Sequence, residues 1–405
     1  MPPRPSLLEI FAVALRLGCT SFGGPVAHLA YFRKEYVEKR RWLDDAHYAD
    51  IVALCQFLPG PASSQTGFAV GCLQRGLAGG LAAWLGFTLP SAVLMIGFAY
   101  GVASLGDPGA AGWLRGLKAA AVAVVAQAVW QMWRKLCPDL PRSILAGLSA
   151  GLLVFLPQTG AQVAVIAAGA LVGGVFLKTA DGGGTGSPTS SSTSDPAELV
   201  VTPPKVGAAL LILFFVLLAG LPILTRLAPS PPLEVADKFY RSGSLVFGGG
   251  HVVLPLLERE VVAPGWVAHD QFLAGYGAAQ AVPGPLFTFS AYLGAVMNHG
   301  PGGVAGGLWA LAAIFLPALL LVAGALPFWQ TLRHQPAAQA ALRGANAAVV
   351  GVLLAALYHP VGTAGLVDGR STALAVAAFV ALQSARVPAW AVVGLAAAAG
   401  ALLWP

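Results

Sequence analysis

FLPGPASSQTG, residues 57–67, places two prolines and two glycines inside a strongly apolar chain. Proline lacks a backbone N–H and clashes with the preceding turn, and glycine costs about 1 kcal/mol in a helix interior. A nearly matching stretch, AVPGPLFTFSA at residues 281–291, occurs in the second half of the chain. The sequence therefore predicts two interrupted helices at comparable places in two related halves.

The composition around these stretches is that of an integral membrane protein. Of the 405 residues, 57% are hydrophobic and only 10% are charged, and the mean hydropathy is +0.74. Soluble domains carry about 25% charged residues, whereas apolar runs of about 20 residues, the length that spans a bilayer, recur along this chain. The net charge of +6 is carried mostly in connecting loops, which indicates orientation in a lipid bilayer rather than nucleic-acid binding.

A polar linker divides the chain into two halves of comparable size. Residues 179–205 form the only low-complexity polar stretch and are expected to be flexible, because they are rich in glycine, serine and threonine. The expected organisation is a first domain over residues 1–178, this linker, a linking transmembrane helix over 206–228, and a second domain over 229–405.

Residues that are uncommon in membrane helices recur between the halves at a nearly constant offset. At a shift of 225 residues, the aligned pairs are Glu9 with Glu234, Arg16 with Arg241, Phe22-Gly23-Gly24 with Phe247-Gly248-Gly249, and Lys34-Glu35 with Arg259-Glu260. At a shift of 224 residues, Gln56-x-x-Pro59-Gly60-Pro61 falls on Gln280-x-x-Pro283-Gly284-Pro285. The offset drifts by only a few residues, which indicates a duplication.

The loops between apolar segments predict how the halves are oriented. About six such segments are expected in each half; in the first they cover approximately residues 7–24, 44–58, 62–75, 76–104, 111–135 and 142–177, the last long enough for two helices. The loop at 33–41 carries five basic residues, and its counterpart at 258–265 carries one. The positive-inside rule places the first loop in the cytoplasm and the second on the opposite face. The predicted fold is an all-α polytopic membrane protein with two inverted repeats of transmembrane or re-entrant helices.

Interrupted backbone at membrane depth persists only where protein buries it or a water-filled cavity borders it. Transporters place such segments between inverted repeats, where the N-termini of half-helices direct N–H groups at an anion. TSFGGP (20–25) and VFGGGH (246–251) give a second pair of openings. A substrate site is therefore expected at the breaks. The alternative is that these glycines and prolines only let helices kink or pack closely.

The candidate substrate-binding residues are those at the four breaks and the basic or amide side chains at repeated positions. In the first half they are Arg16, Phe22, Gly23, Gly24, Gln56, Pro59, Gly60, Pro61, Ser63, Ser64, Gln65 and Lys118. In the second half they are Arg241, Gly248, Gly249, Gln280, Pro283, Gly284, Pro285 and Asn346. The hydroxyl and amide side chains that follow the first PGP motif have more apolar counterparts after the second, so the first half is expected to hold the ligand.

Charged residues inside the apolar segments are candidates for function because a buried guanidinium is costly and is normally retained for an anion, a counter-charge or a cavity. Arg16 lies about nine residues into the first apolar segment. It either contacts substrate, pairs with Glu9 two turns earlier on the same face, or snorkels to the interface; the same alternatives hold for Arg241. The candidates for ion coupling are Glu9, Glu35, Glu234 and Glu260, although loop salt bridges are the simpler role for the second and fourth. His28 and His251 do not align in the repeat and are expected at the membrane interface.

The chain lacks the motifs of the common cofactor and metal sites. It contains no HExxH, GxSxG, P-loop or EF-hand pattern and no His and Asp cluster at metal-ligand spacing, so no cofactor or metal is expected. An intramembrane enzyme remains a remote alternative, because titratable residues are too sparse for a nucleophile and base. GxxxG motifs at Gly147/Gly151 and Gly169/Gly173 suggest close helix packing or a homodimer face.

Residues 21–71 and 239–297 resemble the paired domains of the CHR family of chromate ion transporters, in its long two-domain form. These segments carry the FGG openings and the Q-x-x-PGP motifs at matching internal spacing, and the resemblance covers nearly the whole chain outside residues 179–205. The resemblance implies a prokaryotic plasma-membrane protein that exports chromate and confers resistance, with sulfate as a competing tetrahedral dianion. Membrane potential or an ion gradient would drive such transport, and a transporter of sulfate or another small anion is the alternative.

Overall fold

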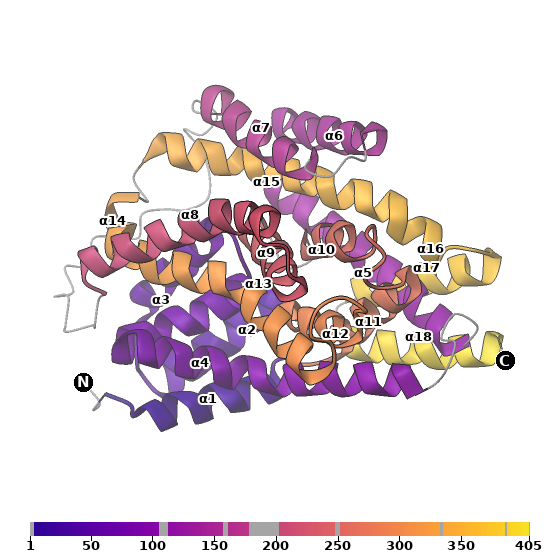
Figure 1. The fold of residues 1–405 in the computed structure, drawn as a ribbon, viewed down its shortest axis with the longest axis horizontal. Coiled ribbons are helices and arrows are strands. Elements are labelled where there is room, and N and C mark those ends of the chain that lie inside the picture. Colours follow the sequence, from indigo (N-terminus) through magenta and orange to yellow (C-terminus); the bar gives the residue numbers. More distant parts are fainter. Residues whose placement is uncertain are drawn as a thin grey trace.

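The computed structural model describes residues 4–104, 112–156, 161–177, 202–247, 252–332, 335–384 and 387–404. Every regular element within these ranges is helical, and helices from the two halves of the chain are interleaved (Figure 1). Five helical stretches among the described residues are long and apolar enough to cross a membrane, namely Ala62–Val102, Gly112–Leu136, Pro204–Leu227, Gly303–Phe328 and Pro336–Gly365. The protein is therefore membrane-integral, as the composition predicts.

The first half of the chain forms seven α-helices and one π-helical segment among its described residues. They are α1 (Leu7–Thr20), α2 (Gly24–Phe32), η1 (Arg33–Lys39), α3 (Asp45–Phe57), α4 (Ala62–Ser104), α5 (Gly112–Leu136), α6 (Leu140–Phe155) and α7 (Ala161–Phe176). The expected segments 62–75 and 76–104 join in α4, where the backbone at Arg75 and Gly76 leaves helical geometry. The segment 142–177 is divided between α6 and α7.

The second half begins with α8 (Pro204–Leu227), which covers the segment expected as the linking helix. The linker before it lies outside the described residues up to position 201. The elements that follow are α9 (Pro231–Ser244), α10 (Val253–Val261), α11 (His269–Ala281), η4 (Leu286–Thr288), α12 (Phe289–Val296), α13 (Gly303–Ala325), η5 (Leu326–Phe328), α14 (Trp329–Leu332), α15 (Pro336–Ala356), η6 (Leu357–Gly362), α16 (Thr363–Gly365), α17 (Gly369–Gln383) and α18 (Ala389–Leu403).

Capping residues define where several helices begin. The Ser6 hydroxyl accepts a hydrogen bond from the amide of Glu9 at 3.1 Å, and the Asp44 carboxylate accepts one from the amide of His47 at 2.8 Å. Asp368 opens α17 with a reciprocal capping box. Such caps satisfy backbone N–H groups that have no partner within the helix. They therefore define where α1, α3 and α17 begin.

The C-terminal hairpin of each half lies on the long helix of the other half. Helices α6 and α7 pack on α15, and α17 and α18 pack on α5 (Figure 1). Gly116 of α5 faces the backbone carbonyl of Ala396 in α18, and Gly344 of α15 faces the carbonyl of Gly169 in α7. A Cβ atom at Gly116 or Gly344 would collide with that carbonyl, so the small residues permit the close helix crossings.

Of the two GxxxG motifs, Gly169/Gly173 therefore lies inside the protein, where it packs against α15. A Cβ atom added at Gly147 or Gly151 would meet nothing within 4 Å. The largest hydrophobic core draws on both halves, because residues of α4 to α7 pack there with residues of α9 to α13 and of α15. The crossings and this shared core join the two halves into a single packed structure.

Candidate functional site

The breaks of one half contact the breaks of the other through two backbone hydrogen bonds. The amide of Gly60 in the first PGP motif donates to the carbonyl of Val246, next to the second FGG opening, at 2.7 Å. The amide of Gly284 in the second PGP motif donates to the carbonyl of Ser21, next to the first FGG opening, at 2.9 Å. The repeat aligns Gly60 with Gly284 and Ser21 with Val246, so both contacts join equivalent positions.

These two hydrogen bonds correct one expectation. The sequence predicts that N–H groups at the PGP breaks are free to bind an anion, but those of Gly60 and Gly284 already have partners in the opposite half. The prolines on either side of each glycine have no N–H to offer. The amides of the PGP motifs therefore hold the halves together, and substrate donors must come from neighbouring groups.

The glycine of each PGP motif is required by its backbone conformation and surroundings. Gly60 has φ +128° and Gly284 has φ +100°, values that disfavour residues with a side chain. A Cβ atom at Gly60 would lie 2.7 Å from Nε2 of Gln65, and one at Gly284 would lie 2.8 Å from Oγ of Ser91. Gly23 and Gly24, which precede and open α2, also have positive φ, at +96° and +77°. The three described break segments therefore depart from helical geometry, as the sequence predicts.

Buried polar side chains follow the first PGP motif at the start of α4. Ser63, Ser64 and Gln65 are each at most 2% exposed. Gln65 donates from Nε2 to the carbonyl of Pro59 at 2.8 Å and so stabilises the break itself. Its Oε1 atom and the hydroxyl of Ser64 have no hydrogen-bond partner among the described residues. Since burial of an unpaired polar group is costly, these atoms are candidates for ligand contact.

A second group of buried polar side chains surrounds the contact between Ser21 and Gly284, and of these the sequence pattern pointed to His28 alone. The hydroxyls of Ser21 and Thr88 are buried without a partner among the described residues. Ser91 donates to the carbonyl of Thr88 at 3.0 Å and lies beside Gly284. His28, expected at the membrane interface, is instead buried at 2% exposure with its ring edge-on to Phe87.

The two glutamines before the PGP motifs lie differently. Gln56 is exposed near the end of α3, whereas Gln280 is half-buried near the end of α11 and its Nε2 atom has no partner among the described residues. Phe22 is half-buried and contacts the ring of Trp390 at a centroid distance of 6.2 Å. Three other predicted positions, Gly248, Gly249 and His251, lie outside the described residues.

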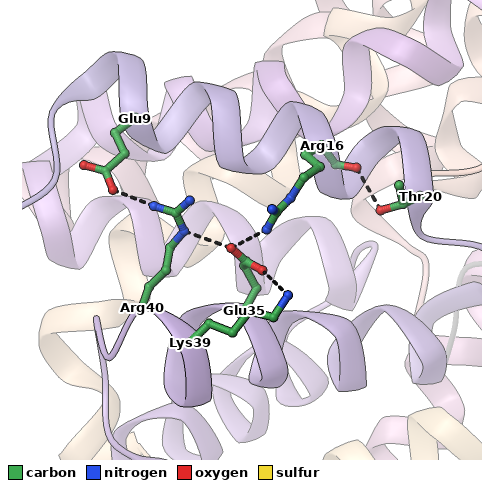
Figure 2. Close-up of polar contacts among 6 residues, drawn as sticks. All are labelled: Glu9, Arg16, Thr20, Glu35, Lys39 and Arg40. Atoms are coloured by element: carbon green, nitrogen blue, oxygen red, sulfur yellow. Dashed lines mark hydrogen bonds and ion pairs between the residues drawn. The ribbon is translucent and has the colours of Figure 1, made fainter.

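Arg16 pairs with a carboxylate other than the predicted one. Its guanidinium contacts Glu35 of η1, while Glu9 is paired with Arg40 at 2.5 Å (Figure 2). Arg40 also donates from Nε to Glu35 at 2.8 Å, and Lys39 lies 3.5 Å from the same carboxylate. The alternative of a pair between Arg16 and Glu9 is wrong, because Glu35 of η1 pairs with Arg16 and Arg40 pairs with Glu9.

The electrostatics of this network centre on Glu35. Its side chain is 5% exposed, and burial opposes ionisation, but the hydrogen bond from Arg40 and the charges of Arg16, Lys39 and Arg40 hold its pKa below the ordinary value. The Arg16 side chain is 53% exposed. Its guanidinium therefore retains open faces that an anion can reach in addition to Glu35.

The equivalent arginine of the second half has two acidic neighbours. Arg241 contacts Asp237 one turn earlier on α9 and lies 3.9 Å from Glu260 of α10. Lys238 holds Glu260 at 2.7 Å. Glu234 does not pair with Arg241, contrary to the alternative derived from spacing, because His299 occupies it at 2.9 Å.

Lys118 lies in an ion pair between the halves. Its ammonium group is 2.6 Å from the Asp270 carboxylate at the start of α11, and its side chain is 10% exposed. The aligned residue Asn346 is half-buried on α15. Among the described residues, no group of three His, Cys, Asp or Glu side chains is arranged to hold a metal ion.

The chromate transporter family matches residues 8–174 and 233–401. A chromate transport protein of Pseudomonas aeruginosa is 28% identical over 379 residues, covering 87% of this chain and 80% of that protein. A probable chromate transport protein of Synechococcus elongatus is 25% identical over 413 residues, covering 99% and 97%. No solved structure matches this chain.

Proposed function

This chain belongs to the chromate transporter family, and on that premise we propose that it exports chromate across a prokaryotic plasma membrane and so confers chromate resistance. The relatives are named as transporters, which points away from an enzyme. In the proposed orientation the basic loop 33–41 faces the cytoplasm, because it carries five basic residues against one in its counterpart.

The proposed substrate site lies where the breaks of each half contact the other. One observation carries this proposal: the hydroxyls of Ser21, Ser64 and Thr88 are buried beside these contacts without a hydrogen-bond partner among the described residues. A dianion that leaves water needs donors in place of its hydration shell, and neutral hydroxyls supply them without a permanent charge that would trap it. Ser64 also lies in the first turn of α4, where the helix dipole favours an anion.

Arg16 supplies the counter-charge as the anion approaches. Its exposed guanidinium is shared with Glu35, so an anion that contacts Arg16 competes with that carboxylate. Arg241 and Glu260 form the aligned pair in the second half. Glu35 and Glu260 thereby become the proposed coupling carboxylates. Glu9 is linked to Glu35 through Arg40, and Glu234 pairs with His299.

Transport follows when one half rocks against the other about the two backbone contacts, as in transporters with inverted repeats. A negative cell interior favours expulsion of a dianion by about 2.3 kcal/mol per charge per 100 mV, or about 4.6 kcal/mol for two charges. Membrane potential is therefore a sufficient driving force. Sulfate is the proposed competitor, because hydroxyl donors recognise a tetrahedral oxyanion and do not identify its central atom.

The test is transport by the purified full chain in sealed liposomes. Radiolabelled chromate inside the vesicles should leave when an interior-negative potential is imposed, and external sulfate or a collapsed potential should slow the efflux. The Ser64→Ala and Thr88→Val variants should each weaken transport several-fold, because each removes one donor. Efflux at the rate of protein-free liposomes would contradict the proposed function, and wild-type efflux from both variants would contradict the proposed site.

A further inference from the structure

A small, partly open cavity lies between residues of the two halves, apart from the PGP contacts. Its volume is about 30 Å³, room for about two water molecules. Gln162 of α7 contributes one wall, and Arg241, Ser242, Arg259 and Glu260 of α9 and α10 contribute the others, together with apolar side chains. The first half of the chain therefore completes a cavity that is built mainly by the second half.

Hydrogen-bond donors line this cavity. Ser242 is 2% exposed, and its hydroxyl has no partner among the described residues. The Nε atom of Arg241 is also buried without one. Gln162, which is 6% exposed, makes a long hydrogen bond of 3.5 Å from Nε2 to the carbonyl of Pro255. Donors held in the interior without partners are costly unless a ligand or water satisfies them.

The guanidinium groups on the cavity wall can bind an anion that takes the place of a loosely held carboxylate. Arg241 and Arg259 bring two guanidinium groups to its wall, and Glu260 is the acidic group on the same wall. Glu260 is 3.9 Å from Arg241 but 2.7 Å from Lys238. Nearby, Asp237 contacts Arg241, and Glu258 lies 3.3 Å from His269. Glu260 can therefore stay with Lys238 when an anion occupies its place beside Arg241.

The corresponding place in the first half lacks these donors. The repeat aligns Arg259 with Lys34, which is exposed, and Ser242 with Leu17, which has no polar side-chain atom. The donor set is therefore a property of the second half and not a general consequence of the repeated fold.

We propose that this cavity is a second binding site for a tetrahedral oxyanion, occupied on the path to or from the site at the PGP contacts. Arg241 and Arg259 bind the anion's charge, and Ser242 and Gln162 donate to its oxygens. The inference rests on the proposed function and adds a second binding site, whose residues lie outside the breaks. The small volume requires Glu260 to move away from Arg241, while it keeps its contact with Lys238, when the anion binds.

The test counts binding sites on the purified full chain with radiolabelled sulfate and, separately, chromate, by equilibrium dialysis in detergent. Two sites are expected for the wild type, and one for the double variant Ser242→Ala and Arg259→Gln. The single variants should weaken the second site about tenfold or more, since each removes a hydrogen bond to a charged group. Arg259→Lys should recover part of the lost affinity because it restores the charge.

Lys34→Gln is the matched control, because it removes the aligned but exposed cation of the first half, and both sites should keep wild-type affinity. One wild-type site whose affinity is unchanged in the double variant would overturn this inference. If the wild type transports chromate but has only that one binding site, the second site is disproved and the proposed function stands. A wild-type protein that neither binds nor transports either anion contradicts the proposed function itself.

Discussion

The two halves of the molecule place the same ion pair in different surroundings. In the first half, Glu35 is held by Arg16, Arg40 and Lys39 around one buried carboxylate (Figure 2). In the second half, Arg241 approaches the aligned Glu260 but contacts Asp237 more closely.

The partners of the outer glutamates differ in the same way. Glu9 pairs with Arg40, a permanent cation, whereas Glu234 pairs with His299. The arginine–glutamate pair is thus common to both halves, and its neighbours have diverged. Under the proposed function, this difference in neighbours leads us to expect that the two halves bind the anion with different strength.

The largest effect is expected where the halves have the same geometry. Gly60→Ala should lower the free energy of unfolding by about 2–5 kcal/mol, because it combines backbone strain with a collision against Gln65 and Ala318. Gly284→Ala should cost less, since Ser91 is a side chain that can rotate away. Thermal unfolding of the purified proteins in detergent measures both.

Gly97→Ala is the control, because a Cβ atom there meets nothing within 4 Å and lies in a helix. It should leave stability unchanged or slightly increased. If Gly60→Ala unfolds at the same temperature as this control, the backbone contacts at the PGP motifs do not hold the halves together.

The next effect separates the two arginines. Arg16→Gln should reduce chromate efflux about 100-fold or more, because the anion then meets the Glu35 carboxylate without its exposed counter-charge. Arg241→Gln should reduce efflux less, since Arg259 remains in its cavity. Efflux is measured in liposomes at equal protein content, with Lys34→Gln as the control. Wild-type efflux from Arg16→Gln would leave Arg16 a structural role only.

The pH dependence of stability should reveal the Glu35 network. Because its cationic neighbours hold the pKa of Glu35 below the ordinary value of 4.5, the ionised carboxylate stabilises the fold at pH above that value. This stabilisation is lost as the pH falls through the lowered pKa. The difference in unfolding temperature between the wild type and Glu35→Gln should therefore shrink as the pH falls from 7 to 3. A difference that stays constant would show that the charge of Glu35 contributes nothing.

The smallest effect concerns an ion pair between the halves that the repeat does not reproduce at the aligned positions. A double-mutant cycle of Lys118→Ala and Asp270→Ala should give a coupling free energy of about 0.5–1 kcal/mol, because the Asp270 side chain is 45% exposed and solvent screens the pair. The same cycle at Asn346 and Asp45, the approximate counterparts, should give none. Coupling near zero in both cycles would remove this difference between the halves.

Local sequence features predicted the helical membrane fold and the positions of the described breaks. Apolar runs and proline or glycine clusters act on the residues next to them, so α4 begins directly after Pro61. The partners across the molecule could not be read in this way. The acceptor for the Gly60 amide lies at Val246, and no local pattern links two residues so far apart.

The charged groups show the same limit. Spacing along α1 correctly places Glu9 and Arg16 on one helix face, yet Arg16 pairs with Glu35 of η1. Asp237 and His299 were missed because they have no counterpart of the same kind in the first half, so the repeat gave no signal for them. Asp270 could have been found, since it aligns with Asp45. Ser21 could have been found, since it directly precedes the first FGG opening.

The central claim is that a tetrahedral oxyanion binds where the breaks of one half contact the other. The most direct measurement is an anomalous-scattering map of the full chain crystallised with chromate, which locates the chromium atom. The account predicts a chromium peak whose oxygens lie within hydrogen-bonding distance of the hydroxyls of Ser21, Ser64 or Thr88. Chromium found only elsewhere in the protein, with these hydroxyls packed against apolar side chains, would contradict it.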